Sequence, residues 1–218
     1  MEDDGAVGGD AAAWVPDTTS LPRLRAAAED CRGCELWADA TQVVFSAGPR
    51  KARLMLVGEQ PGDVEDREGE PFVGPAGRIL DDVLEAAGID RSDVYLTNAV
   101  KHFRHEKRGK RRIHQKPTVA HITACHPWLE VEVVAMTPDV VVCLGATAGR
   151  AVLGRPVRVG EERGRVLEPG EKTVPGASAV VLTSHPSSVL RLRDRDERRD
   201  SIAAIADDLR VAAELTDA

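Results

Sequence analysis

The stretch Arg53-Leu-Met-Leu-Val-Gly58 is an apolar run of strand length that ends in glycine, and Glu-Gln-Pro-Gly-Asp63 follows it directly. An apolar run of this length bounded by polar residues predicts a buried strand. Similar apolar runs occur at Val94–Asn98, Val140–Gly145 and Ala179–Ser184. The sequence therefore predicts at least four buried strands.

Helical patterns separate these strands. Ile79, Leu80, Val83 and Leu84 lie at helical spacing, and further helices are expected before the first strand and after the last. The expected helices are Leu21–Asp30, Gly74–Ala87, Thr118–Met136, an alanine-rich helix that ends near Gly154, and Asp194–Glu214. Strands that alternate with helices predict an α/β fold with a mainly parallel central sheet.

The strand ends carry the unusual sequences. Parallel sheets of this kind bind ligands beyond the carboxyl ends of their strands. The expected strand ends are followed by Gly58-Glu-Gln-Pro-Gly62, Asn98-Ala-Val-Lys101, Gly145-Ala-Thr147 and His185-Pro-Ser-Ser188. We expect polar groups from three of these segments to converge on one pocket. The glycine turn lacks the Lys and Ser/Thr of a phosphate-binding loop, which argues against a nucleotide phosphohydrolase.

The charge is unevenly distributed. The net charge of the 218-residue chain is −7, yet residues 101–116 hold eight Lys/Arg and one Glu, which leaves 21 basic and 35 acidic residues elsewhere. One short basic segment on an acidic body is what phosphate neutralisation requires, although a solvated basic loop has the same composition. Phe72 lies in a glycine-rich loop, Gly69-Glu-Pro-Phe72-Val-Gly74, where a planar ring can stack on a base.

The four cysteines are too few and too unevenly spaced for a secreted disulfide scaffold, and they suit a cytosolic metal site. The N-terminus has no signal-peptide pattern, and no apolar run approaches the roughly 20 residues that a membrane span needs. We therefore expect a cytoplasmic protein without a membrane partner. Residues 1–19 are expected to be a disordered tail, and residues 20–218 a single domain.

The glycine turn, the Phe72 loop, Thr97-Asn98 and His185-Pro186-Ser187 occur in an order that resembles the uracil-DNA glycosylase superfamily, specifically its iron–sulfur members. The resemblance covers about Leu21 to the C-terminus. It implies a three-layer α/β/α sandwich, a uracil-containing DNA substrate in single- or double-stranded form, and a monomeric enzyme.

The resemblance also implies roles for single residues. Phe72 would stack on the flipped uracil, and the amide of Asn98 would read its edge. His185 would stabilise charge on uracil O2, and the Glu59 carboxylate would oppose positive charge on the sugar. Further residues implied in binding are Gln60 and Asp63 for uracil and Ser187 for DNA.

The resemblance further implies a 4Fe–4S cluster. Cys31-Arg-Gly-Cys34 and Cys125 match ligand motifs of the iron–sulfur members. Their remaining cysteine ligand is replaced here by His102, so His102 and Cys143 are both candidates for the fourth ligand, and His102 is favoured because imidazole can replace thiolate on iron. Zinc is the chemical alternative for a Cys₃His set.

The segment Lys110-Arg111-Arg112-Ile113-His114 resembles the loop of the UdgX subgroup of these glycosylases, whose members trap themselves on DNA. This resemblance implies that His114 attacks sugar C1′ after uracil leaves, while Lys110, Arg111 and Arg112 hold DNA phosphates. Glu59 is expected to orient His114. The alternatives are a conventional turnover glycosylase, in which water captures C1′, and a non-catalytic metal-cluster DNA-binding protein.

Overall fold

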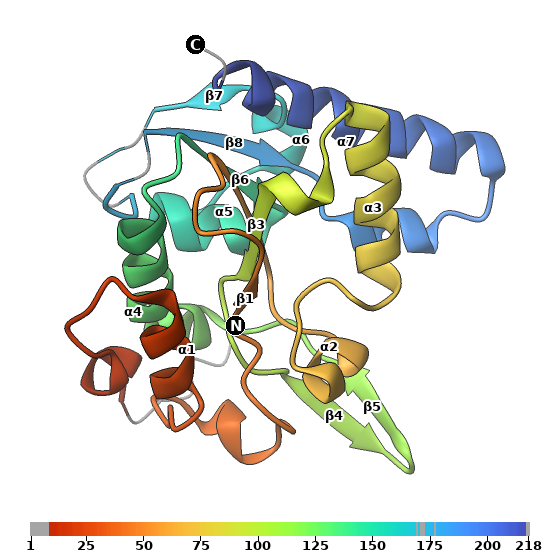
Figure 1. The fold of residues 1–218 in the computed structure, drawn as a ribbon. Coiled ribbons are helices and arrows are strands. Elements are labelled where there is room, and N and C mark those ends of the chain that lie inside the picture. The colour runs from red at the N-terminus through yellow and green to blue at the C-terminus, as the bar shows by residue number, and fades with distance from the viewer. Residues whose placement is uncertain (1–8, 169, 171–172, 177, 217–218) are drawn as a thin grey trace.

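The computed structural model describes residues 9–168, 170, 173–176 and 178–216. Its centre is a six-stranded sheet in the order β1-β3-β2-β6-β8-β7 (Figure 1). The four inner strands are parallel, and the short edge strands β1 and β7 run antiparallel to their neighbours. The strands are β1 (Ser46–Ala47), β2 (Leu54–Gly58), β3 (Val94–Asn98), β6 (Val140–Leu144), β7 (Val166–Leu167) and β8 (Ala179–Thr183).

Helices cover both faces of this sheet, which confirms the predicted α/β sandwich (Figure 1). On one face, Met55 and Val57 of β2 belong to a core with residues of α1 (Leu21–Ala28), α4 (Val119–Met136) and α5 (Ala146–Leu153). On the other face, Leu54 and Leu56 pack with α3 (Pro75–Ala87) and α7 (Arg195–Glu214). Burial on both faces explains why the central strands are continuous apolar runs.

The helix ends follow local sequence signals. Thr118 caps α4 through its side chain, and Asp194 caps α7 in the same way. Gly88 and Gly154 end α3 and α5 in the left-handed conformation that glycine adopts without a steric penalty. The predicted long helices therefore agree with the structure within two residues at each end.

A small second sheet lies outside the predicted pattern. Strands β4 (His105–Arg108) and β5 (Arg111–His114) form a hairpin that projects from the body beside helix α2 (Asp63–Glu68) (Figure 1). Gly109, with a φ of +59°, forms the turn. The remaining elements are α6 (Val159–Glu162) and the 3₁₀ helices Ala11–Trp14, Glu35–Ala38, Arg91–Asp93 and Pro186–Arg191.

The N-terminal segment is ordered further toward the terminus than its composition predicts. Residues 1–8 of the expected disordered tail lie outside the described residues, but Ala11–Trp14 forms a 3₁₀ helix and Ala11 is buried. A Cβ on Gly33 would lie 2.7 Å from the Ala11 backbone, so the missing side chain of Gly33 permits this contact. Tertiary packing against the Cys31–Cys34 loop explains why composition predicted this segment poorly. No helix in the described ranges is both long and apolar enough to cross a membrane.

Candidate active site

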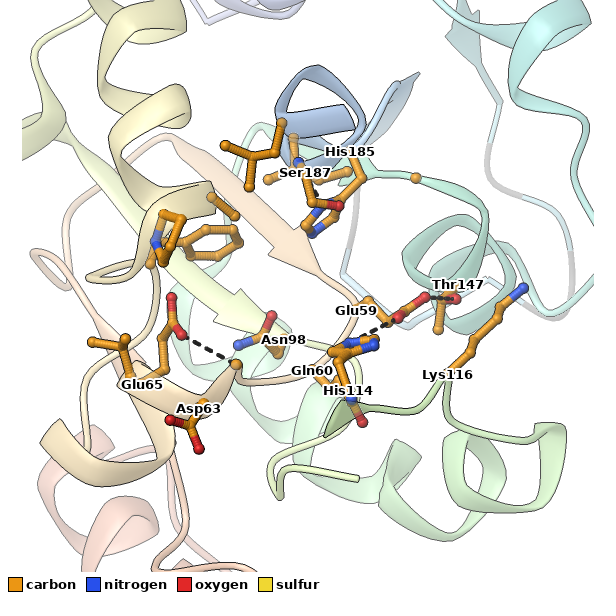
Figure 2. A pocket seen from close by; sticks show the side chains of 18 of the residues that line it. Glu59, Gln60, Asp63, Glu65, Asn98, His114, Lys116, Thr147, His185 and Ser187 are labelled. Carbon is orange, nitrogen blue, oxygen red and sulfur yellow. Dashed lines mark hydrogen bonds and ion pairs between the residues drawn. The ribbon is translucent and has the colours of Figure 1, made fainter. Parts of the chain in front are cut away.

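A cavity of about 800 Å³ lies at the carboxyl ends of β2, β3, β6 and β8 (Figure 2). This is the position that the parallel sheet predicts for a ligand. The cavity brings together eight residues singled out from the sequence: Glu59, Gln60, Asp63, Phe72, Asn98, His114, His185 and Ser187. Lys110, Arg111 and Arg112 are not among its lining residues.

Gly58, the last residue of β2, lies close to the Asn98 and Phe72 side chains that line the cavity. A Cβ at this position would lie 2.3 Å from Asn98 Oδ1 and 2.6 Å from Phe72 Cζ, so a side chain there would displace both groups. Phe72 itself has a φ of +58°, which is unusual for a residue with a side chain. Its carbonyl accepts a hydrogen bond from Arg91 Nη2 at 3.0 Å, and a Cβ on Gly77 would collide with that carbonyl. The loop thus holds the Phe72 ring in place at the expense of local backbone strain.

His185 presents one ring nitrogen to the cavity. Its Nδ1 accepts a hydrogen bond from the Ser187 backbone N–H at 3.1 Å. The neutral ring therefore carries its proton on Nε2. Burial, helped by the nearby His114 and Arg191, lowers the pKa of His185 to about 4. At neutral pH His185 is thus an uncharged hydrogen-bond donor, suited to an oxygen on which negative charge develops.

Glu59 and His114 meet at one side of the cavity (Figure 2). Glu59 Oε1 lies 3.5 Å from His114 Nε2, and Glu59 Oε2 accepts a hydrogen bond from the Thr147 hydroxyl. Thr147 follows β6 in the Gly145-Ala-Thr147 segment that the sequence marks as an unusual strand end. The carboxylate is therefore held from one side by Thr147 while it faces the imidazole on the other.

Arg112 faces the body of the protein, in contrast to the phosphate contact that the sequence predicts. Its guanidinium lies 2.5 Å from Asp63 Oδ1 and 2.5 Å from Asp66 Oδ2. The Arg112 side chain is 14% exposed and that of Asp66 is fully buried. Burial alone would raise the pKa of Asp63, but Arg112 outweighs this effect and holds it below its ordinary value. Arg112 thus fastens β5 to α2.

Phe103 supports the same face of the hairpin. Its ring is buried, and it lies 4.9 Å from the ring of His105 and 6.1 Å from that of His114 between centroids. The Arg112 guanidinium lies 5.4 Å from the Phe103 centroid. The sequence analysis assigned a role to the neighbouring His102 but none to Phe103, so this aromatic support was missed.

Gln60 binds protein backbone, although uracil was its expected partner. Its Nε2 donates to the carbonyls of Arg104 at 3.2 Å and Gln115 at 3.0 Å, and its Oε1 accepts from the Arg104 N–H at 3.1 Å. Arg104 and Gln115 flank the hairpin on its two sides. Gln60 therefore joins both chains at the base of the hairpin.

The rim of the cavity is basic and partly apolar. Lys110 and Arg111 are exposed at the hairpin tip, and Lys116 and Arg191 line the cavity. Leu190, which the sequence did not indicate, is 41% exposed at the same rim. An exposed leucine between cationic side chains is the combination with which some proteins enter a distorted duplex.

The predicted cluster ligands lie away from this cavity. Cys31, Cys125 and His102 are buried, and Cys34 is half-buried. Trp128 Nε1–H points to Cys31 Sγ at 3.2 Å, and the Lys101 backbone N–H points to Cys125 Sγ at 3.3 Å. Hydrogen bonds of this kind stabilise thiolate ligands and tune iron–sulfur clusters.

Burial shifts the pKa values of these candidate ligands. Burial raises the pKa of Cys34 to about 11 and that of Cys125 to about 12, and it lowers that of His102 to about 4 against the opposing charge of Asp66. A bound cation would hold the sulfurs as thiolates, and a neutral imidazole is ready to coordinate. Within the described ranges, no three His, Cys, Asp or Glu side chains are grouped so that they could hold a metal ion.

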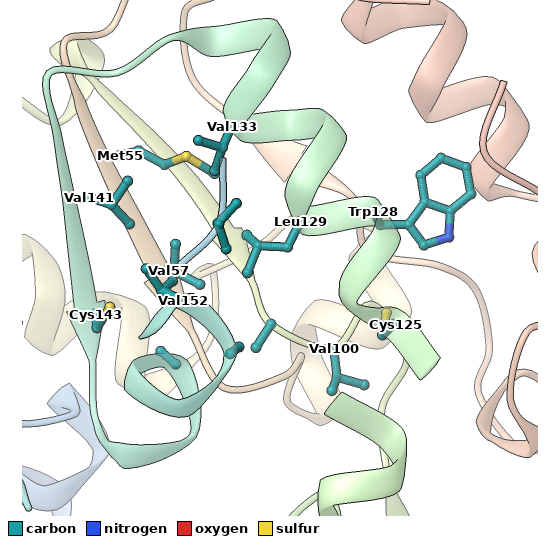
Figure 3. Packing of buried hydrophobic residues seen from close by; sticks show 14 of the residues in the cluster. Met55, Val57, Val100, Cys125, Trp128, Leu129, Val133, Val141, Cys143 and Val152 are labelled. Carbon is teal, nitrogen blue, oxygen red and sulfur yellow. The ribbon is translucent and has the colours of Figure 1, made fainter. Parts of the chain in front are cut away.

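Cys143 belongs to a different environment. It lies in the middle of β6, fully buried, in register with Val57 and Leu182. Figure 3 places it among the valines of the sheet, well away from Cys125 on α4. Burial is the cause that raises its pKa, whereas Cys31 and Cys34 both contribute to the pKa of Cys125. This arrangement argues against Cys143 as a ligand beside Cys125.

Comparison with known proteins agrees with the site. The model of the uracil DNA glycosylase superfamily matches residues 45–210. The type-4 uracil-DNA glycosylase of Thermotoga maritima is 38% identical over 170 residues, which cover 78% of this chain and 82% of the relative. The type-4 enzyme of Archaeoglobus fulgidus is 34% identical over 167 residues, covering 73% and 78%. The type-5 enzyme of Pyrobaculum aerophilum is 31% identical over 150 residues, covering 61% and 63%. Together with the strand-end cavity, these matches show that the chain belongs to the uracil-DNA glycosylase superfamily.

Proposed function

We propose that this protein excises uracil from DNA and then retains the stripped sugar as a covalent adduct on His114, as a member of the UdgX subgroup. The observation that carries the proposal is the position of His114. Its imidazole reaches the cavity of a uracil-DNA glycosylase fold and faces Glu59 at 3.5 Å. A self-trapping enzyme of this kind acts in a single turnover.

Excision begins when uracil enters the cavity from the DNA stack, as enzymes that act on a single base require. Phe72 stacks on the base, and the Asn98 amide offers a donor and an acceptor to its edge. As the C1′–N1 bond breaks, its electron pair passes to the uracil ring, and the Nε2–H of His185 donates to the oxygen that gains charge. The Glu59 carboxylate lies near enough to the cavity to oppose the positive charge left on the sugar.

Capture follows at the same carbon. A ring nitrogen of His114 uses its lone pair to form a bond to the electron-deficient C1′, and the ring becomes positively charged. Glu59 offsets this charge, and Thr147 holds Glu59 in position. Water is the competing nucleophile, and an imidazole already placed beside C1′ outcompetes it through proximity.

The DNA contacts come from the rim. Lys110 and Arg111 at the hairpin tip are free to approach phosphates, whereas Arg112 is engaged by Asp63 and Asp66. Leu190 is placed to fill the space that the flipped base leaves in the stack.

We also propose that Cys31, Cys34, His102 and Cys125 hold a 4Fe–4S cluster. When bound, the cluster supplies a structural crosslink between segments that are distant in sequence. The N–H donors to Cys31 and Cys125 are already in place. Reduced cysteines as ligands suit a protein that works in the cytoplasm.

The test compares wild-type protein with His114→Ser on end-labelled uracil-containing DNA. Wild type should give a band of reduced mobility that survives boiling in detergent, and peptide mapping should locate the sugar on His114. His114→Ser should release uracil without this band, because water can enter the vacated space. Full adduct yield from His114→Ser, or an ordinary abasic product from wild type, would reject the covalent mechanism. Absence of free uracil from both would instead favour a non-catalytic DNA-binding protein.

A further inference from the structure

An ion pair lies entirely inside the protein, between the active-site cavity and the cysteine cluster. Lys101 and Glu132 form a salt bridge in which the side chains are 1% and 0% exposed. Transferring two charges from water into the protein interior costs free energy that their mutual attraction often does not offset. Replacing such a pair with apolar residues of similar volume is therefore often neutral or stabilising for the folded protein. A gain in stability is therefore a poor explanation for this pair.

The three protons of the Lys101 ammonium group all have acceptors. They go to Glu132 Oε2, to Thr97 Oγ1 at 2.5 Å and to the backbone carbonyl of Asn98 at 3.0 Å. Asn98 is the last residue of β3, and its amide is the base-reading group of the proposed function. The ammonium group thus binds the main chain of that residue directly.

Glu132 is fixed just as completely. Its Oε1 accepts from the Tyr95 hydroxyl at 2.9 Å and lies 2.9 Å from Thr97 Oγ1. Tyr95 and Thr97 both belong to β3, whereas Glu132 belongs to α4. The carboxylate therefore joins the end of β3 to the helix that carries Cys125.

The helix face that holds Glu132 also reaches the cysteines. Cys125, Trp128 and Glu132 are three and four residues apart, so they share one face of α4. The Lys101 backbone N–H contacts Cys125 Sγ, while its ammonium lies 5.3 Å from the centroid of Phe45. A continuous set of contacts therefore runs from Asn98 through Lys101 to the cysteine site.

We propose that the Lys101–Glu132 pair is a positioning device that fixes the Asn98 main chain from α4, so that the Asn98 amide meets the uracil edge in one orientation. This inference rests on the proposed base-reading role of Asn98. Neither residue of the pair touches the substrate. They act by fixing the end of β3 in one geometry. An apolar contact is less directional and would allow this strand end to move.

The test replaces the pair without leaving a buried charge. In Lys101→Met/Glu132→Gln, Met fills the volume of the lysine stem and Gln retains partners for Tyr95 and Thr97. Lys101→Met/Glu132→Leu serves as a second variant in case the first does not fold. Val133→Ala is the matched control, since Val133 is fully buried on α4 beside Glu132 but belongs to the apolar core. Circular dichroism and thermal melting establish the folded fraction of each protein.

Single-turnover excision from saturating uracil DNA is then measured well below each melting temperature. We expect the pair variants to lose about ten- to a hundredfold in rate, the size of effect that a small misplacement of a binding group can cause. Binding of uracil-free DNA should be unchanged, and Val133→Ala should excise at the wild-type rate. In an Asn98→Ala background, replacing the pair should cause little further loss.

Two results would overturn the inference. One is a folded pair variant that excises uracil at the wild-type rate. The other is a combined variant whose loss in rate equals the product of the loss in the pair variant and the loss in Asn98→Ala. A different result marks failure of the proposed base-reading role. If Asn98→Ala itself excises normally, Asn98 does not read the base.

Discussion

Replacement of Arg112 by Met tests whether the Arg112 side chain anchors the hairpin through ion pairs or binds a DNA phosphate. The guanidinium contacts Asp63 and the fully buried Asp66, and it lies over the ring of Phe103. An isolated two-stranded hairpin is at best marginally stable. The β4–β5 hairpin therefore needs these contacts, together with Gln60, to present His114 to the cavity.

The size of the effect follows from burial. Breaking a buried pair costs about 3–5 kcal/mol and an exposed pair about 0–1 kcal/mol. With one buried and one half-exposed partner, we expect a loss of roughly 2–3 kcal/mol, between those limits. At 1.4 kcal/mol per tenfold change, docking of the hairpin would weaken by roughly 30- to 150-fold. This is an upper limit for the loss in adduct rate, because the Gln60 hydrogen bonds remain.

The assay measures adduct formation and uracil release separately with saturating DNA, and it measures DNA binding at several salt concentrations. Arg111→Met is the control, since it removes the same charge from an exposed neighbour in the same strand. A lost phosphate contact reduces the salt slope of binding by about 0.9. We expect this reduction in Arg111→Met only, and a slow adduct step in Arg112→Met only. If Arg112→Met instead shows the smaller salt slope and a normal adduct rate, Arg112 binds phosphate and the hairpin needs no such anchor.

Three further predictions concern single groups. Phe72→Ala should lose roughly 1–3 kcal/mol of base stacking, measured as weaker excision of uracil. Because the pKa of His185 is about 4 when folded and about 6.5 when unfolded, acidification through this window protonates the unfolded chain first. Thermal stability should therefore be full above this window and fall across it by up to about 1.4 kcal/mol per pH unit, and His185→Asn should lessen the fall in melts from pH 7 to pH 4. His102→Ala should lower the bound iron and visible absorption of purified protein, whereas Cys143→Ala should leave both intact; the opposite pattern would assign the fourth ligand to Cys143.

The four inner strands of the central sheet were predictable because they are buried on both faces. Each became a continuous apolar run, and the parallel arrangement then fixed where their ends would meet. This is why Asn98 and His185, which lie far apart in sequence, could be expected in one cavity. Local pattern was sufficient for these elements since burial alone determines them.

The hairpin was not predictable in the same way. Its strands are mostly charged and lack an apolar alternation, so nothing local favours a sheet. What holds them is the pairing of Arg112 with Asp63 and Asp66, almost fifty residues earlier. The same distance hid the role of Gln60, whose partners are backbone groups that no sequence pattern displays. Contacts of this kind are evident only in three dimensions.

The lack of a side chain at Gly58 has a consequence for how substrate choice can change. The Asn98 amide and the Phe72 ring, which line the cavity, both lie against the space that a Cβ at this position would take. A side chain can adopt another rotamer to admit a bulkier guest, but the backbone of Gly58, which pairs with Asn98 of β3, has no such freedom. Even a single methyl group at this position would displace the Asn98 amide or the Phe72 ring. We therefore expect a change in the accepted base to come from substitutions of residues that line the cavity, with glycine retained at position 58.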